Sequence, residues 1–112
     1  MKEKDLKVTA LYDLYAPLFS EKKREAFEMY YFEDLSLKEI SEHTGTTRQG
    51  IRDLIVRTGE ELHAYEASLG LYEKEMARER GALALRAVAD RIEEAFPEEA
   101  RILRETAGQK GE

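Results

Sequence analysis

The sequence contains no cysteine. The 112-residue chain therefore cannot form a disulfide framework, a thiolate metal site or a cysteine nucleophile. It also lacks any apolar run approaching the ~20 residues that a membrane-spanning helix needs. The charged N-terminal stretch MKEKDLKVTALYDLYAP has no apolar signal core. These absences lead us to expect a cytoplasmic protein that does not enter a membrane.

An excess of basic residues is missing as well. The formal net charge is -6 at pH 7, and the pI is near 5.1. Acidic residues outnumber basic ones in residues 1–70 and again in residues 71–112. Such a chain cannot grip a polyanion by bulk charge alone. Its high charged fraction, together with only two prolines, is typical of a helical protein with solvated outer faces.

Sequence signals of catalysis are also absent. No glycine-rich phosphate loop and no serine in a nucleophile motif occurs. The two histidines, His43 and His63, are far apart and have no regular acidic partners. Paired carboxylates such as Glu60-Glu61 are adjacent, so they splay around a helix instead of facing each other. We therefore expect no enzymatic activity, no metal and no cofactor.

Helical periodicity is what the sequence has in abundance. Apolar residues recur at helical spacing over about residues 4–16, 21–32, 36–44, 47–69 and 71–95, and a last helix starts at Pro97. No strand pattern occurs. We expect an all-α protein with a helix-turn-helix domain over residues 1–70, a C-terminal helical extension over 71–107 and a flexible tail over 108–112.

The stretch SLKEISEHTGTTRQGIRDLI predicts two helices joined by a tight turn. Ser36 and Glu39 form a capping-box pattern, Gly45 suits a left-handed turn, and Thr47 can cap the next helix. Isoleucines at 51 and 55 would anchor that helix on one side. This is the helix-turn-helix layout, whose second helix places N-terminal side chains in the major groove of DNA.

Several polar residues near this second helix are candidates for nucleic-acid contact. Arg48 can pair with guanine and Gln49 with adenine, whereas Arg52 and Arg57 can meet phosphates. The candidate set is Thr47, Arg48, Gln49, Arg52, Asp53 and Arg57, with Lys22 and Lys23 adding backbone contacts. Asp53 opposes this interpretation, because a carboxylate is repelled by phosphate, although it can accept from cytosine. The residue pattern leaves nucleic-acid contact and a hairpin used for packing or protein contact both open.

The blocks LYDLYAPLFSEKKREAFEMYYFEDLSL and TTRQGIRDLIVRT, in this order, resemble the small bacterial YlxM-type proteins associated with the signal recognition particle. Their helix-turn-helix is similar to region 4 of sigma-70 factors. The resemblance implies a role in protein targeting or regulation, with DNA, the particle's RNA or its proteins as partners. Carried over by position, it implies base contacts at Arg48, Gln49 and Asp53, with Arg52 near phosphate. An aromatic is usual where Arg52 stands and a lysine where Val56 stands, and the extension after about residue 76 is not covered.

Two further patterns concern the apolar residues. Tyrosines at 12, 15, 30 and 31 raise the idea of base stacking, but their helical spacing favours core or interface positions. A coiled-coil-like stripe runs through Leu62, Tyr65, Leu69, Tyr72, Met76 and Leu83. We expect this stripe to support a homodimer, which would present two recognition helices. The alternative is that it packs on the chain's own helices.

Overall fold

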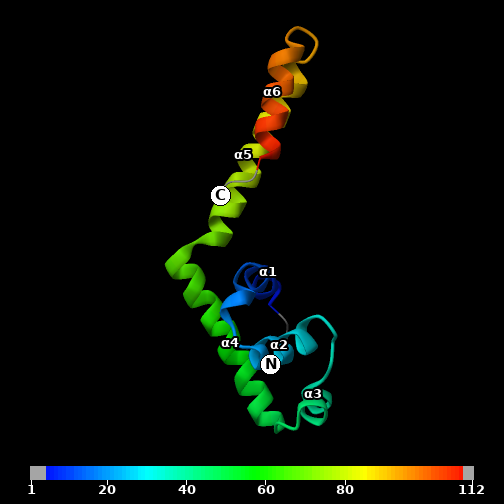
Figure 1. The fold of residues 1–112 in the computed structure, drawn as a ribbon, viewed down its shortest axis with the longest axis vertical. Coiled ribbons are helices and arrows are strands. Elements are labelled where there is room, and N and C mark those ends of the chain that lie inside the picture. Colours follow the sequence, from blue (N-terminus) through cyan, green and yellow to red (C-terminus); the bar gives the residue numbers. More distant parts are fainter. Residues whose placement is uncertain (1–4, 110–112) are drawn as a thin grey trace. The chain divides into compact units, whose positions relative to one another are not determined.

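A computed structural model of the protein describes residues 5–109, and over this range it contains six α-helices and no strand (Figure 1). The helices are α1 (Leu6–Tyr15), α2 (Glu21–Tyr31), α3 (Leu37–Thr44), α4 (Arg48–Leu69), α5 (Leu71–Ile92) and α6 (Pro97–Gly108). The predicted all-α class is confirmed. The chain forms two compact units, residues 1–72 (unit 1) and residues 73–112 (unit 2), which are described separately.

The ends of two helices differ from the sequence prediction. The first helix starts after Asp5, whose carboxylate accepts the Lys7 N–H at 2.9 Å, and the predicted start at residue 4 lies outside the described residues. It ends at Tyr15, and the chain continues as a short 3₁₀ helix, Ala16–Leu18. Pro17 lies inside that turn and has no N–H for an α-helical hydrogen bond. The fifth helix ends at Ile92, three residues before its predicted end.

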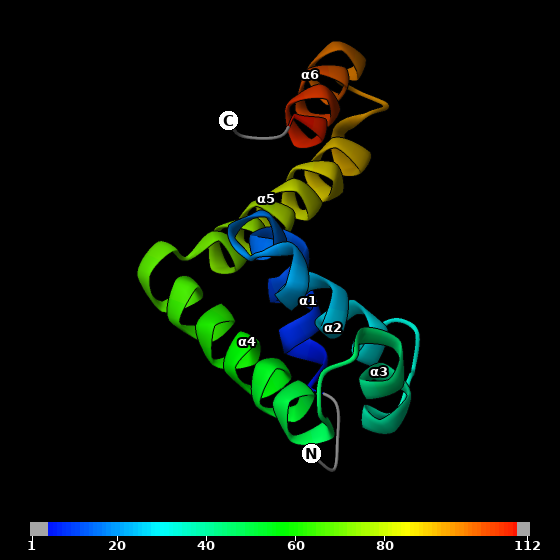
Figure 2. The same cartoon turned by 60° about the horizontal axis from the view of Figure 1, so that its bottom comes forward.

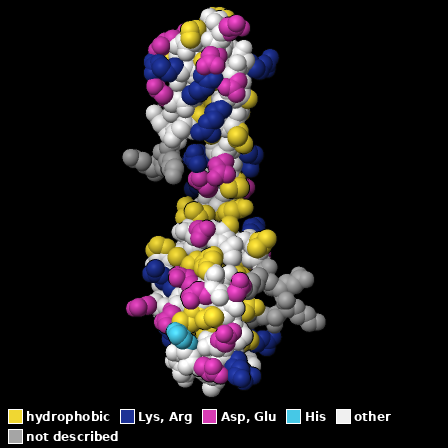
Figure 3. Space-filling view, turned by 90° about the vertical axis from the view of Figure 1, so that its right-hand side faces the viewer, with side chains coloured by type: hydrophobic (Ala, Val, Ile, Leu, Met, Phe, Trp, Pro, Cys, Tyr) yellow, Lys and Arg dark blue, Asp and Glu magenta, His cyan; other side chains and the backbone are white. Residues whose placement is uncertain are grey.

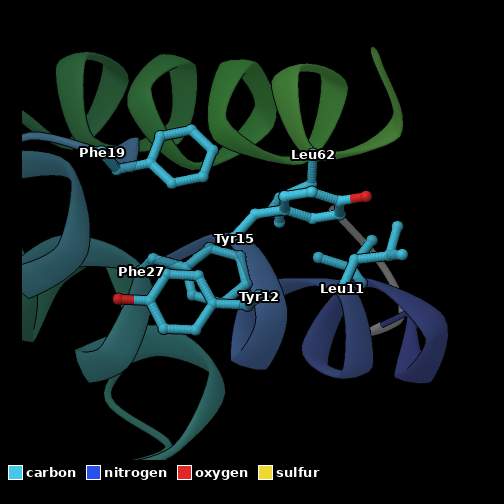
Figure 4. Packing of buried hydrophobic residues seen from close by; sticks show 7 residues of the cluster. Leu11, Tyr12, Tyr15, Phe19, Phe27 and Leu62 are labelled. Atoms are coloured by element: carbon cyan, nitrogen blue, oxygen red, sulfur yellow. The ribbon is translucent and has the colours of Figure 1, made fainter. Parts of the chain in front are cut away.

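The core of unit 1 lies where α1 and α2 pack on α4. Leu11, Phe27 and Leu62 are completely buried there, and burying such a side chain contributes about 1.5–3 kcal/mol. The rings of Tyr12 and Phe27 are stacked with their centroids 4.3 Å apart. Figure 4 shows these two rings nearly face to face and Leu62 extending from α4 toward Tyr15. Tyr12 and Tyr15 are therefore core residues and are not available to stack on bases.

The coiled-coil-like stripe is divided between two helices in the structure. Leu62 is buried in the core of unit 1, and Tyr65 and Tyr72 pack against the same core. Helix α4 ends at Leu69, and the next residue, Gly70, adopts the left-handed conformation with φ 62°. The stripe packs on the chain's own helices over this part, because α1 and α2 supply the apolar surface that a second chain would have offered.

Unit 2 is a hairpin of α5 and α6, which lie side by side in both ribbon views (Figures 1 and 2). Arg104 of α6 joins the two helices, with ion pairs to Asp90 at 2.7 Å and Glu93 at 2.8 Å. Within the described range, the buried hydrophobic residues of unit 2 are Ala82, Ala89, Ala100 and Ala107. The larger apolar side chains Leu83, Val88, Phe96 and Ile102 are exposed.

Candidate nucleic-acid interface

Local hydrogen bonds fix the start of α3 and the turn that joins it to α4. The Ser36 hydroxyl accepts from the Glu39 N–H at 3.0 Å, and the Glu39 carboxylate accepts from the Ser36 N–H at 2.9 Å, which completes the predicted capping box. Hydrogen bonding from Ser36 to the carboxylate, first of all from its backbone N–H, lowers the pKa of the Glu39 carboxyl. Gly45 ends α3 with φ 79°, a conformation that other residues adopt only with strain. The Ser41 hydroxyl then donates to the carbonyl oxygen of Thr46 and holds the turn.

The N-terminus of α4 is open to a ligand. The Thr47 hydroxyl accepts from the Gly50 N–H at 3.0 Å, and a Cβ at Gly50 would lie 2.9 Å from the Thr46 side chain. The N–H groups of Arg48 and Gln49 remain without a helical acceptor. No acidic residue occupies the first turn of α4, whereas α2, α3, α5 and α6 each have at least one there. The partial positive charge of this helix end is therefore available to an anion.

Helix α4 has one buried face and one exposed face. Ile51 and Ile55 are buried against Ile40 of α3 and its neighbours, and Thr58 is buried one turn further. The Thr58 hydroxyl donates to the Leu54 carbonyl, so burial leaves it no unmet hydrogen bond. The predicted contact residues on α4 and its cap are all exposed: Thr47, Arg48, Gln49, Arg52, Asp53 and Arg57. The structure thus exposes all six within the N-terminal half of one helix and its cap.

The charges on this face are only partly neutralised. Arg48, Arg52 and Arg57 make no ion pair with any residue in the range 5–109. Arg48 and Arg52 lie one turn apart, and Asp53 and Arg57 are also one turn apart. Basic and acidic side chains intermix over the face of the molecule in Figure 3. The positive charge of α4 is therefore concentrated in its first three turns, where Asp53 is the sole acidic residue.

The two predicted lysines on α2 have different surroundings. Lys22 is exposed and lines a surface hollow together with Thr46, Ile51 and Leu54, next to the turn. The Lys23 ammonium group instead donates to the Glu61 carboxylate at 2.7 Å and lies 6.0 Å from the centre of the Phe19 ring. The charge of Lys23 is thus already paired within unit 1, whereas Lys22 can reach a ligand at the turn.

Sequence reasoning missed two contacts at this surface. The Gln49 side-chain amide donates to the Asp53 carboxylate at 2.8 Å. The spacing of four residues was the available signal, because side chains so placed are neighbours on a helix. The Lys23–Glu61 pair joins residues 38 positions apart, and no local pattern indicates it.

The described part of the chain offers neither a metal-binding cluster nor a membrane-spanning helix. No group of three or more histidine, aspartate or glutamate side chains there could hold a metal ion. None of its helices is both long and apolar enough to cross a bilayer.

The short α3, the Gly45 turn and the capped, half-exposed α4 define a helix-turn-helix protein. The comparison with known families agrees: residues 2–100 match the family described as "Putative helix-turn-helix protein, YlxM / p13 like" (UPF0122), and the chain belongs to this family. The description is that of a helix-turn-helix protein and not of an enzyme.

Several bacterial proteins of the same family are similar to this chain. A UPF0122 protein of Caldanaerobacter subterraneus subsp. tengcongensis is 47% identical over 74 residues, which cover 66% of this chain and 63% of that protein. A UPF0122 protein of Clostridium botulinum is 44% identical over 78 residues, covering 70% of this chain and 72% of the other. One of Streptococcus agalactiae is 41% identical over 76 residues, with 68% and 69% covered.

Proposed function

We propose that the protein binds nucleic acid through the exposed side of α4, from Thr47 to Arg57. The observation that carries this proposal is the pair Arg48 and Arg52, which are exposed, without ion pairs among the described residues, and next to a helix N-terminus free of acidic side chains. Arginine in such a place offers donors to guanine or to phosphate. Lys22, beside the turn, adds a phosphate contact.

The wider role is an accessory or regulatory one in the signal-recognition-particle pathway, in the cytoplasm. The resemblance of the helix-turn-helix to that of YlxM-type proteins and of sigma-70 region 4 supports this role. The ligand is DNA or the particle's RNA, with the particle's proteins as further partners. In this role the protein performs no catalysis and acts by occupying its nucleic-acid site.

A protein-binding adaptor is the second candidate function. Val56 lies on the same side of α4 as Gln49 and is 42% exposed, and Glu60 follows one turn later. An apolar residue beside an acidic one favours a protein surface over phosphate. An adaptor would bind a protein partner in a salt-tolerant way and would lose that binding on Val56→Glu.

The test is a binding titration with the full chain, using a short mixed-sequence DNA duplex and the signal-recognition-particle RNA as probes. The double variant Arg48→Ala/Arg52→Ala should weaken binding by about 10- to 100-fold, because the single base contact of Arg48 supplies roughly 1–3 kcal/mol and the phosphate contact of Arg52 is lost with it. Arg80→Ala/Arg86→Ala is the matched control, because it removes the same charge from exposed positions of α5. Equal binding by the two double variants would contradict the proposal.

We propose further that two copies associate through the C-terminal hairpin. The described part of unit 2 buries only alanines and exposes Leu83, Val88 and Ile102. A segment of fewer than ~40 residues rarely forms a sufficient core alone. Two such hairpins can form a four-helix bundle that buries the exposed apolar side chains of both. A second copy is therefore the occupant that best matches this surface.

A further inference from the structure

The hydrogen bond between Gln49 and Asp53 determines which chemical groups the exposed side of α4 presents. The Gln49 Nε2 donates to the Asp53 Oδ1 at 2.8 Å, and both side chains are exposed. A glutamine amide has two N–H groups and one carbonyl oxygen, whereas an ionised aspartate only accepts. One glutamine N–H is used by Asp53. The pair therefore offers the Gln49 carbonyl oxygen, the second Asp53 oxygen and a single remaining N–H.

This set of groups favours some bases over others. Adenine and cytosine both present an exocyclic amine in the major groove, which needs an acceptor such as the Gln49 Oε1 or the Asp53 carboxylate. The remaining Gln49 N–H can also meet the N7 of adenine. Guanine presents two acceptors, O6 and N7, and needs two donors. Asp53 has none to give, and its charge opposes both the guanine edge and phosphate.

The neighbouring side chains have the opposite preference. Arg48 precedes Gln49 at the open end of the helix, and its planar fork of donors matches guanine O6 and N7. Arg52 lies one turn after Arg48 and is placed for phosphate or for a second guanine. One edge of the face is thus rich in donors and the Gln49–Asp53 pair is rich in acceptors, so two adjacent base positions would be read in different ways.

The absence of aromatic side chains near the exposed side of α4 favours duplex DNA over RNA as the ligand. No phenylalanine, tyrosine or tryptophan occurs from residue 33 to residue 64, so the face has no ring on which an unpaired base could stack. Single-stranded RNA is usually held by such stacking. The deep, narrow major groove of duplex RNA does not admit side chains, whereas the major groove of B-form DNA admits a helix.

We propose that Gln49 and Asp53 act together as a reader of amino-bearing bases, adenine or cytosine, in the major groove of B-form DNA, next to a guanine read by Arg48. Asp53 orients the Gln49 amide and excludes guanine from this position. It also weakens binding to unrelated sequences through its charge. This inference rests on the proposed function and adds the class of base that the site selects.

The experiment selects bound sequences from a library of random-sequence DNA duplexes with the wild-type chain, with Asp53→Asn and with Glu60→Gln. The wild type should enrich a guanine beside an adenine or cytosine and reject guanine at the second position by about tenfold or more. Asp53→Asn supplies donors in the same shape, so guanine should be accepted there. Affinity for an unselected duplex should also rise roughly two- to fivefold, because one negative charge is lost near phosphate.

The control variant Glu60→Gln removes one negative charge two turns after Asp53 on the same side of α4. It should keep the wild-type base preference. An unchanged preference in Asp53→Asn, or guanine tolerated by the wild type, would overturn the inference while leaving the proposed function intact. Equal binding of an RNA duplex and a DNA duplex would overturn the major-groove assignment. A wild-type chain that binds no DNA duplex and no RNA would overturn the proposed function as well.

Discussion

At the residue scale, the packing of Tyr12 in the core changes the pKa of its hydroxyl. Its ring stacks on Phe27, and its hydroxyl donates to the Glu28 carboxylate. Burial, strengthened by the bond to Glu28, raises the pKa of Tyr12 to about 12. The ionised phenolate would be desolvated and close to a negative carboxylate, so the folded chain favours the neutral phenol.

This raised pKa predicts a loss of stability at high pH. The folded-state pKa lies above the ~10 of an unfolded tyrosine, so the contribution of Tyr12 is complete below about pH 10 and is lost as the pH rises through about 12. The free energy of unfolding, measured by urea titration across this interval, should therefore fall. In Tyr12→Phe the fall should be shallower, with the remainder coming from Tyr15, whose pKa burial also raises.

Tyr65→Phe is the matched control for this measurement. The Tyr65 ring packs against Tyr15 and Phe19, but its hydroxyl makes no hydrogen bond to a described residue. Its pH dependence should match that of the wild type. An equally steep loss of stability in Tyr12→Phe would contradict the account.

The sequence predicts some residue-level features of the interface but not others. That Asp53 would be exposed follows from helical spacing, because it lies on the side of α4 opposite the buried isoleucines. The exposure of Arg48, which lies on nearly the same side as Ile55, instead reflects its place in the first turn of α4. That Lys23 would be paired with Glu61 does not follow, since it depends on how α2 packs on α4. Local spacing indicates which side chains share a face, and tertiary packing decides which charges are already used.

At the element scale, the turn before α4 depends on the conformation of one glycine. Gly45 has φ 79°, and no atom would lie within 4 Å of an added Cβ, so a substitution there would be penalised by backbone strain alone. Gly59 lies inside α4 and also has open space around a Cβ, but its backbone is helical. Because a Cβ would have free space at both positions, the two alanine variants differ only in whether the backbone conformation suits an L-residue.

The expected results for alanine have opposite signs at these two positions. Gly45→Ala should destabilise the chain by about 1–2 kcal/mol, the cost of a left-handed conformation for an L-residue. Gly59→Ala should stabilise it by roughly 0.5–1 kcal/mol, because alanine loses less conformational entropy in a helix. Urea unfolding measures both values. A Gly45→Ala chain as stable as the wild type would show that the turn does not require a left-handed glycine, and a destabilised Gly59→Ala chain would contradict the prediction for α4.

At this scale, sequence patterns predict local hydrogen bonds but not the packing partner of an apolar stripe. The capping box at Ser36 and Glu39 was predictable because all its bonds join residues three apart. The packing partner of the stripe from Leu62 to Leu83 was not predictable in this way. Its spacing indicates an apolar seam but does not say which surface covers it, and α1 and α2 cover its first part.

At the scale of the whole molecule, the two units differ in how they are stabilised. Unit 1 buries aromatic and branched side chains, whereas the described part of unit 2 buries alanines and leaves Leu83 65% exposed. Burial of alanine removes little apolar surface from water. The proposed association of two copies would supply the missing burial to unit 2.

Sedimentation equilibrium tests this association. The wild-type chain should sediment as a dimer at micromolar concentration. Leu83→Glu/Val88→Glu should sediment as a monomer, because two charges would have to be buried in the interface. Lys38→Glu, an exposed polar position on α3 outside the hairpin, is the control and should leave the dimer intact. A monomeric wild type across the whole concentration range would contradict the proposal.

The net charge of -6 affects how the whole molecule meets a nucleic acid. Overall, such a chain repels a polyanion, so binding must depend on a small number of local contacts. Counterion release provides a count of those contacts, since each phosphate neutralised contributes about -0.9 to the slope of log affinity against log salt for a DNA duplex.

The measurement that tests the central claim most directly is this salt dependence, recorded on a mixed-sequence DNA duplex. The account predicts a steep negative slope for the wild type. The slope should become shallower by about one unit in Arg48→Ala/Arg52→Ala, as the phosphate contact of Arg52 is lost, and stay unchanged in Arg80→Ala/Arg86→Ala. Identical slopes and affinities for the wild type and both double variants would contradict it.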